Sequence, residues 1–360
     1  AQAAHTSLPW MRATPRSPRR LRIPSCRHVR PAAGAIAAVA LGLLAVPAAG
    51  LSGERGGGAA LAAARALVPP EVALKKGGEF EGHEFWDEHD ELLTRAWEEY
   101  GWRHPELYTS GPVFDQRYVH SELRQAAEAA RAGDGEHRAR DLFDEVVPGV
   151  FASEKLFTEQ FVTDLLEELE HIESSGIPRR RPNGMNRYGV ILDNVGLQSA
   201  LRGLVDAYVR PLAGMLFPEL VAATDAEEHY AFTVRYEVSG DTELAKHADA
   251  SVATLNLCLG KPGWRGGALR FFEYDGRGIY ALPKDGAGAG AGDVEFRPGL
   301  AVLHRGQHKH QALPLSDGER TNVIVWLFAE HGVVRVAPYP KDEQLTDRGR
   351  WRARGHASEL

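Results

Sequence analysis

The segment His310-Gln-Ala-Leu-Pro314-Leu-Ser-Asp-Gly318-Glu-Arg320 decides how the second half of this chain folds. Pro314 and Gly318 are turn residues, and apolar, β-branched runs lie on both sides of them. The pattern therefore predicts two strands that are joined as a hairpin. A hairpin of this length returns Arg320 to the neighbourhood of His310.

Further short β-branched or aromatic runs, separated by Gly, Pro and Asp turns, lie around this hairpin at residues 232–236, 254–259, 268–272, 300–304 and 322–328. Their spacing predicts an antiparallel barrel or sandwich. The Gly/Ala repeat at residues 286–292 has no apolar side chain larger than Ala, and we expect a flexible loop there.

Helical patterns precede these strands, at residues 84–102, 121–146, 157–172 and 196–216. The second should break near Gly133, and Pro211 should bend or divide the fourth. Thr158 or Ser153 is available as the N-cap of the third. His and acidic residues in the first could form a metal cluster, but a solvated helix face is the better interpretation because polar residues must lie opposite its apolar stripe.

The beginning of the chain differs in composition from the rest. Residues 1–52 contain seven Arg and no Lys, Asp or Glu, while the whole chain has a net charge of −7, so the remainder is twice as negative. Such an acidic body argues against nucleic acid as a partner. A basic stretch followed by an apolar run at residues 32–50 is typical of a signal peptide or membrane anchor.

We therefore expect targeting to the secretory pathway or endoplasmic reticulum, with a plastid or mitochondrion as the alternative. The two cysteines, Cys26 and Cys258, do not decide between these compartments. The predicted organisation is a targeting or anchor segment (1–52), a linker (53–80), a helical region (81–145), a catalytic domain (146–333) and a tail (334–360).

His247 and Asp249 follow one another with a single residue between them, just after a predicted strand. Residues two apart on an extended chain project from one face, so both side chains can reach one metal ion. A further imidazole from His310 would complete a set of two His and one carboxylate. That set leaves three coordination positions open and is diagnostic of non-haem Fe(II) oxygenases.

The arginine and the neighbouring histidines refine this hypothesis. An Arg fork binds a carboxylate through two hydrogen bonds, which suits the C5 end of 2-oxoglutarate for Arg320. His308 and His310 have the same strand parity, so alternation does not separate them. The Pro four residues after His310 and the ten-residue step to Arg320 favour His310, and His308 stays an alternative ligand.

The ordered motif resembles that of the prolyl-4-hydroxylase-like 2-oxoglutarate/Fe(II) dioxygenases. The landmarks are the HxD pair, Gly266-Gly267 before an alternating strand, His-x3-Pro-x3-Gly-x-Arg, and Trp326. More narrowly, YGVILDN from Tyr188, ATLNLCLG from Ala253 and GLAVLHRGQHKH from Gly299 are similar to the 2-oxoglutarate and iron-dependent oxygenase domain proteins of animals and plants. The resemblance covers about half the chain, roughly residues 146–332.

The resemblance implies an all-β catalytic core with flanking helices, folded as a double-stranded β-helix (jelly roll). It implies that His247, Asp249 and His310 hold Fe(II), that Arg320 binds 2-oxoglutarate, and that Tyr236, Thr254 and Trp326 line the co-substrate pocket. O2 would be the second co-substrate, and ascorbate an accessory cofactor. Cys258 stands where many relatives have a Tyr that contacts the co-substrate.

The expected activity is hydroxylation of a C–H bond, with release of succinate and CO2. A Pro or Lys of a protein or peptide is the expected target, since the acidic body would accept a basic peptide. Two alternatives stay open: a non-oxidative cupin-type metal barrel, and a catalytically silent barrel that serves as a binding module. The sequence does not identify the substrate, because loops such as residues 178–189 set specificity in such barrels.

Overall fold

The computed structural model describes residues 58–70, 83–132, 141–182, 186, 188–218, 220–221, 229–273 and 290–328. The predicted targeting segment and the predicted tail lie outside these ranges. Among the described residues, no helix is both long enough and apolar enough to cross a membrane.

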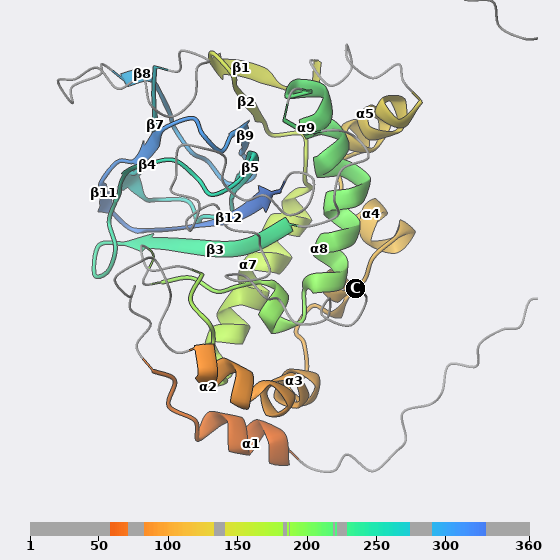
Figure 1. The fold of residues 1–360 in the computed structure, drawn as a ribbon, viewed down its shortest axis with the longest axis vertical. Helices are drawn as coiled ribbons and strands as arrows, with labels where there is room; N and C mark the ends of the chain where they lie inside the picture. The colour runs from red at the N-terminus through yellow and green to blue at the C-terminus, as the bar shows by residue number, and fades with distance from the viewer. Residues whose placement is uncertain are drawn as a thin grey trace, which may run out of the picture. The chain divides into compact units, whose positions relative to one another are not determined.

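Two antiparallel sheets form the centre of the fold (Figure 1). The larger sheet has the order β1 (Asp144–Val147), β2 (Val150–Ser153), β9 (Ala301–Arg305), β5 (Ala253–Cys258), β12 (Glu319–Leu327) and β3 (His229–Glu237). The smaller sheet has the order β4 (Leu244–His247), β10 (His310–Ala312), β7 (Leu269–Phe272) and β8 (Gly290–Val294). The short strands β6 (Arg265–Gly266) and β11 (Leu315–Asp317) pair separately.

The chain passes back and forth between the two sheets. From β3 to β12 it runs through the larger, smaller, larger, smaller, larger, smaller and larger sheet, with β7 and β8 forming one hairpin. This is the connectivity of a double-stranded β-helix, or jelly roll. The predicted fold class is confirmed.

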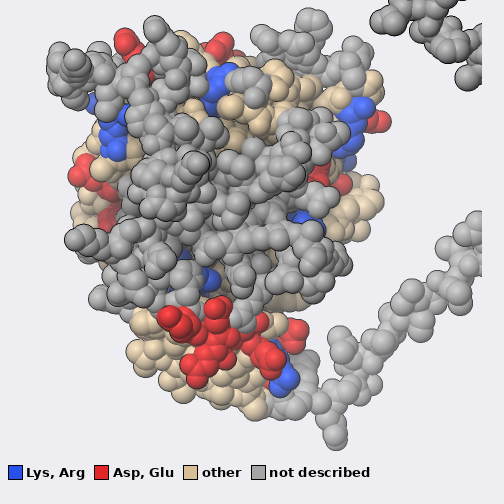
Figure 2. Space-filling view, viewed as in Figure 1, with Lys and Arg blue, Asp and Glu red and all other residues tan. Residues whose placement is uncertain are grey.

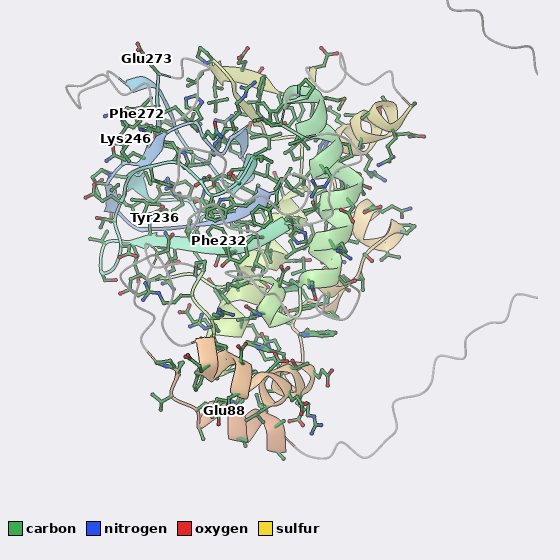
Figure 3. The ribbon with its side chains drawn as sticks, in the orientation of Figure 1. Glu88, Phe232, Tyr236, Lys246, Phe272 and Glu273 are labelled. Atoms are coloured by element: carbon green, nitrogen blue, oxygen red, sulfur yellow. The ribbon has the colours of Figure 1, made fainter. Side chains whose placement is uncertain are left out.

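Alternation along β12 separates the two faces of the larger sheet. Ile324 and Trp326 belong to one interior apolar cluster with Phe232 and Tyr236 of β3. Figure 3 labels Phe232 and Tyr236 along that strand. Val325, between Ile324 and Trp326 in the sequence, belongs to the apolar cluster on the opposite, helical side. Because side chains of a strand alternate between its faces, the same rule places Arg320 and Asn322 in the interior.

The helices lie on the outer side of the larger sheet, where some pack against it and others pack against those helices (Figure 1). They are α1 (Ala59–Arg65), α2 (His83–Glu88), α3 (Asp90–Glu99), η1 (Pro105–Tyr108), α4 (Pro112–Tyr118), α5 (Ser121–Arg131), α7 (Glu159–Ser174), η2 (Asp193–Val195), α8 (Gln198–Leu204), η3 (Val205–Val209) and α9 (Arg210–Leu216). One continuous apolar cluster joins side chains from α3 and α5 to side chains from α7 to α9 and the sheet. Helical region and barrel therefore share a core.

Several helix boundaries agree with the sequence. Thr158 caps α7, since its hydroxyl accepts a hydrogen bond from the Phe161 amide at 3.2 Å. A π-helical turn, η3, divides the fourth predicted helix just before Pro211. The missing amide hydrogen of Pro cannot complete the regular ladder, which accounts for the division at this point.

Other boundaries differ. Residues 84–102 form two helices, α2 and α3, that meet at His89. Residues 144–146, expected at the end of a helix, lie in strand β1 because β2 pairs with them. In the predicted linker, Ala59–Arg65 is helical, as the high helix propensity of Ala favours. In the predicted Gly/Ala loop, residues 290–292 instead extend β8 alongside β7.

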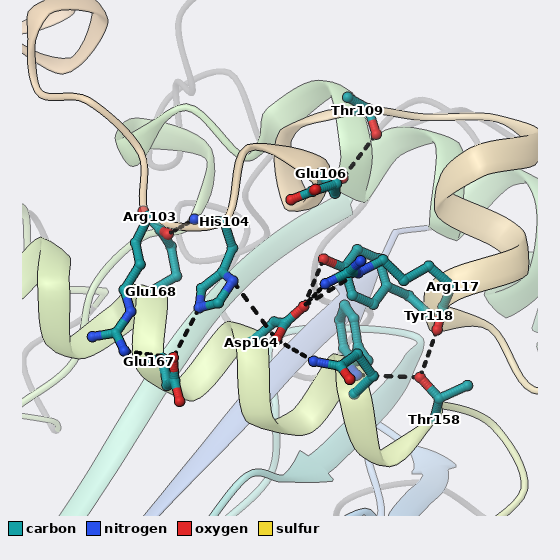
Figure 4. A network of polar contacts seen from close by, with 12 residues as sticks. Arg103, His104, Glu106, Thr109, Arg117, Tyr118, Thr158, Asp164, Glu167 and Glu168 are labelled. Carbon is teal, nitrogen blue, oxygen red and sulfur yellow. Dashed lines mark hydrogen bonds and ion pairs between the residues drawn. The ribbon is translucent and has the colours of Figure 1, made fainter.

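Helix α7 is joined to the preceding helices by two buried carboxylates (Figure 4). Asp164 accepts hydrogen bonds from Arg117 at 3.0 Å and from Tyr118 at 2.9 Å. Glu168, one turn later, accepts from the hydroxyl of Tyr108 at 3.0 Å and from the backbone amide of His104 at 2.7 Å, among others. Buried charges need such partners, so these contacts fix the helical layer against α7.

Acidic side chains gather on the surface of α2 and α3 (Figure 2). Glu84, Asp87, Glu88 and Glu91 are exposed there. Among the described residues, the only three His, Cys, Asp or Glu side chains that could share a metal ion lie elsewhere. A solvated helix face, rather than a metal cluster, is therefore what the structure has on these helices.

Candidate metal centre

His247, Asp249 and His310 meet inside the barrel. His247 ends β4, His310 begins β10, and the two are direct partners in the smaller sheet. The Oδ1 atom of Asp249 lies 3.4 Å from Nε2 of His247 and 3.6 Å from Nε2 of His310. All three ligand atoms lie within 4.8 Å of one another, so one ion could bind all three.

Backbone carbonyls orient both imidazoles. Nδ1 of His247 lies 2.8 Å from the carbonyl oxygen of Ala245, and Nδ1 of His310 lies 2.8 Å from that of His308. A carbonyl only accepts, so each Nδ1 carries the hydrogen and each Nε2 is left as a lone pair directed at Asp249. Fixing the tautomer in this way is what metal-binding histidines require.

The Asp249 carboxylate is held from behind. Its backbone amide donates to the Gly306 carbonyl at 2.8 Å, and its Oδ2 accepts from the Thr254 hydroxyl at 2.6 Å. The Ser251 hydroxyl lies 2.8 Å from that of Thr254. A Cβ at position 306 would meet the Ser251 carbonyl oxygen at 2.0 Å, so only Gly permits this approach. Oδ1 is thereby turned towards the two imidazoles.

The protonation states suit a metal site. Burial opposes ionisation of Asp249, but the neighbouring imidazoles, His310 foremost, hold the pKa of its carboxyl below the ordinary value. Burial lowers the pKa of His310 to about 3, so that ring is neutral near pH 7. Burial also disfavours the charged form of His247, yet Asp249 raises its pKa. A proton on His247 therefore competes with a metal ion.

The donor set fits Fe(II). Ligand atoms at right angles, each about 2.1 Å from an ion, lie about 3.0 Å apart. The observed separations of 3.4 and 3.6 Å need only a small contraction. Two neutral imidazoles and one carboxylate on a single side of the ion leave the opposite side for other ligands, as in non-haem Fe(II) oxygenases.

Arg320 lies in the barrel interior and is 2% exposed. Its guanidinium carbon lies 5.1 Å from the ring centre of Tyr236 and 4.8 Å from that of Phe296. Its Nη1 donates to the Gly267 carbonyl. A Cβ at Gly267, whose φ is +74°, would meet Nη1 at 2.9 Å, which explains this Gly. Nε of Arg320 has no hydrogen-bond partner among the described residues.

Burial lowers the pKa of Arg320, but a guanidinium keeps its charge near pH 7. Within the part of the chain that the structure describes, Glu295 is the one carboxylate that acts on the charge of Arg320, and it forms no ion pair with it. A buried cation with an unused N–H and no ion-pair partner favours binding of an anion. The described residues supply none within ion-pair distance of Arg320. A carboxylate ligand would fill this need.

The three residues predicted to line the co-substrate pocket lie on the larger sheet. Tyr236 is the partner of Arg320 on β3, and burial raises the pKa of its phenol to about 12. Trp326 packs against the aromatic side chains of β3. Thr254 donates a hydrogen bond to the carboxylate of Asp249, a candidate metal ligand, and so orients that carboxylate. Cys258 is buried, its thiol pKa is raised to about 11 by burial, and it lies beside Asn322 in the sheet.

Three further interior residues were not singled out from the sequence as site residues. Nε2 of His304 lies 3.9 Å from Oδ2 of Asp249, while its Nδ1 lies 2.9 Å from the Arg305 carbonyl. The side-chain amides of Asn256 and Asn322 form a hydrogen bond of 2.7 Å. Strand parity gave the available signal, because all three are polar residues at interior positions of apolar strands.

His308, the alternative ligand, lies apart from the cluster. Its Nε2 is 2.8 Å from the carbonyl oxygen of Phe272, and burial lowers its pKa to about 4. The group of potential metal ligands contains His310 and not His308. The geometry therefore favours His310 over His308 as the metal ligand, as does the ten-residue spacing from His310 to Arg320.

Fold and site together define a double-stranded β-helix that contains a centre of two His and one carboxylate. Within that class, residues 97–222 match the OGFOD2-like domain family model. The chain is 36% identical over 247 residues to the Arabidopsis thaliana 2-oxoglutarate and iron-dependent oxygenase domain-containing protein ICU11, covering 66% of this chain and 58% of that protein. The resemblance expected from the sequence is confirmed.

The chain is also similar to a second named relative and to a solved structure. A Rattus norvegicus multifunctional procollagen lysine hydroxylase and glycosyltransferase, LH3, is 31% identical over 231 residues, 60% of this chain and 27% of that protein. The crystal structure of a Pseudomonas putida prolyl-4-hydroxylase aligns with 60% of this chain and 98% of its own, at 19% identity and a TM-score of 0.36. The chain spans only part of the curated relatives, so their whole activities are not transferred to it.

Proposed function

We propose that this protein is an Fe(II)- and 2-oxoglutarate-dependent dioxygenase that hydroxylates a C–H bond, with a Pro or Lys of a protein as its target. The observation that carries the proposal is the combination, in one barrel, of the His247–Asp249–His310 ligand set with a buried Arg320 whose Nε lacks a partner. One 2-oxoglutarate molecule could contact both parts of this site, because its 2-oxo acid end chelates a metal ion and its distal carboxylate can pair with Arg320.

Fe(II) held at this site would supply O2 activation coupled to decarboxylation of 2-oxoglutarate, and the overall reaction would convert substrate C–H, O2 and 2-oxoglutarate into C–OH, succinate and CO2. His247, Asp249 and His310 would hold the ion and leave one side of it open. Arg320 would fix the distal carboxylate and so set the orientation of the co-substrate. The aromatic and aliphatic interior side chains exclude water from the reacting centre.

Two observations favour a Lys- or Pro-containing basic peptide as the substrate. The name of the rat relative includes procollagen lysine hydroxylase, and the net charge of this chain, −7, favours a basic peptide over an acidic one. Ascorbate, expected from the family resemblance, would serve to keep the iron reduced. Both points remain part of the proposal.

The test is aerobic incubation of the Fe(II)-loaded protein with 2-oxoglutarate and a panel of Pro- and Lys-containing peptides, with succinate and peptide mass as readouts. We expect succinate formation that a subset of peptides accelerates, and a gain of one oxygen atom in those peptides. His310→Ala, in which one ligand is lost, is the inactive control. If no peptide accelerates succinate formation, the protein-hydroxylase part fails.

Two other outcomes favour the alternatives. Tight metal binding without any O2-dependent consumption of 2-oxoglutarate would favour a non-oxidative cupin-type barrel. Absence of Fe(II) binding would favour a catalytically silent barrel that serves as a binding module. Metal binding is measured separately from turnover, for instance by the visible spectrum of the Co(II) form, so that the two outcomes are distinguished.

A further inference from the structure

Asn256 and Asn322 form a buried pair of side-chain amides inside the barrel, outside the group of candidate metal ligands. Asn322 is 1% exposed, and its Nδ2 donates to Oδ1 of Asn256 at 2.7 Å. Its own Oδ1 is buried and has no hydrogen-bond partner among the described residues. An unmet buried acceptor costs about 1–3 kcal/mol, so a barrel that keeps one has a use for it.

A second unmet polar atom lies on the same strand face. Arg320 is two residues before Asn322 on β12, so both side chains point into the barrel, from Cα atoms about 7 Å apart. Nε of Arg320 also lacks a hydrogen-bond partner. Two neighbouring groups that are both buried and both incompletely bonded point to one ligand that contacts the two of them.

The amide pair can change what it offers to such a ligand. If both amides turn over together, Nδ2 of Asn256 donates to Oδ1 of Asn322, and the unmet acceptor is satisfied. Nδ2 of Asn322 is then free to donate to a ligand, and Arg320 lies two residues away on the same face of β12. The carbonyl and amino ends of an Asn side chain have nearly the same shape, so the exchange needs no repacking.

We propose that Asn322, held by Asn256, donates a hydrogen bond to the distal carboxylate of the co-substrate and, together with Arg320, selects a dicarboxylic 2-oxo acid. This inference rests on the proposed function and names the residue that refines its co-substrate site. Asn322 is also the direct neighbour of Cys258 across the sheet.

The apolar surroundings of the Asn256–Asn322 pair strengthen a hydrogen bond that Asn322 donates to a ligand. Cys258, Ile324 and Val302 surround the two amides at paired positions of β5, β12 and β9, and each is buried. A thiol with a pKa raised to about 11 and two aliphatic side chains contribute no strong hydrogen-bond donor. In such surroundings a single amide donor to an anion is strong, because water does not compete with it.

The experiment compares two 2-oxo acids on the Fe(II)-loaded protein without O2. 2-Oxoglutarate has a distal carboxylate and pyruvate has none, while both chelate the metal through the same atoms. Their dissociation constants are read from the visible absorption that develops when a 2-oxo acid chelates Fe(II). For Asn322→Ala we expect about tenfold or more weaker binding of 2-oxoglutarate and pyruvate binding within twofold of the unmodified protein.

Three variants complete the design. Asn322→Asp keeps the shape of the side chain but places a negative charge beside the carboxylate of the ligand. It should weaken the binding of 2-oxoglutarate more than Asn322→Ala does. Asn256→Ala removes the partner that holds the amide and should give a smaller loss of the same selectivity. Thr321 directly precedes Asn322 on β12, and its side chain lies on the opposite face of the sheet. Thr321→Ala is therefore the matched control and should change neither the 2-oxoglutarate nor the pyruvate dissociation constant.

The outcomes separate this inference from the proposed function. If the unmodified protein develops no absorption with either acid, the proposed function fails. If it does, and Asn322→Ala binds 2-oxoglutarate normally while Arg320→Ala does not, only the role of Asn322 is refuted. Equal weakening of both acids would also refute it, because it would place Asn322 at the metal end of the co-substrate.

Discussion

Replacing Thr254 with Val tests whether this residue serves the metal or the co-substrate. Valine has nearly the same shape, so the change removes one hydroxyl from a side chain that is 1% exposed. That hydroxyl donates to Oδ2 of Asp249 at 2.6 Å. A hydrogen bond to a charged group contributes about 1.5–3 kcal/mol, and Asp249 can bind a metal well only in one orientation.

We therefore expect Thr254→Val to weaken metal binding about 10- to 100-fold, since 1.4 kcal/mol corresponds to a factor of ten. Titration with Co(II), followed by its visible spectrum, measures the constant without turnover. Thr254→Ser keeps the hydroxyl and should stay within about threefold of the unmodified protein. Unchanged metal affinity combined with weaker 2-oxoglutarate binding would refute the reasoning and return Thr254 to the co-substrate pocket.

Three further predictions concern other parts of the molecule. His310→Ala should abolish binding of Co(II), whereas His308→Ala should retain it within a few-fold; the reverse result would exchange their roles. Asp164→Asn should lower the free energy of unfolding in urea at pH 7. Burial works against the charge of Asp164, but its hydrogen bonds hold the pKa of its carboxyl below the ordinary value. Its contribution to stability is therefore present above about pH 4 and is lost as the pH falls further. A stability difference between Asp164→Asn and the unmodified protein that grows in acid would contradict this role. Cys258, whose pKa burial raises to about 11, should resist alkylation at pH 8 until urea is added, as peptide mass spectrometry can show separately from Cys26.

The sequence predicted the barrel, and local rules indicated which candidate metal ligands would lie together in it. Two residues on an extended chain face the same way, which brings His247 and Asp249 together in any strand register. The hairpin expected between His310 and Arg320 is wrong, because β10 pairs with β4 and β7 in the smaller sheet while β12 pairs with β3 and β5 in the larger one. The chain crosses from one sheet to the other between them, and both side chains are still buried in the barrel.

Features that depend on register and on side-chain rotamers were not predictable in the same way. The Asn256–Asn322 pair forms between β5 and β12, which are more than sixty residues apart, and a one-residue slip would separate the two amides. Thr254 was expected in the co-substrate pocket from the family motif. Its hydroxyl contacts Asp249, five residues earlier in the chain, and no spacing rule specifies that contact.

The strands that carry the two imidazoles are short. β4 has four residues and β10 has three, and their ladder joins only His310 to His247 and Ala312 to Leu244. An ion held by both imidazoles would act as an additional cross-link of this ladder, and binding free energy adds to the stability of the folded form. Cellular iron supply would then govern how long each copy of the protein survives proteolysis, as well as how fast it works.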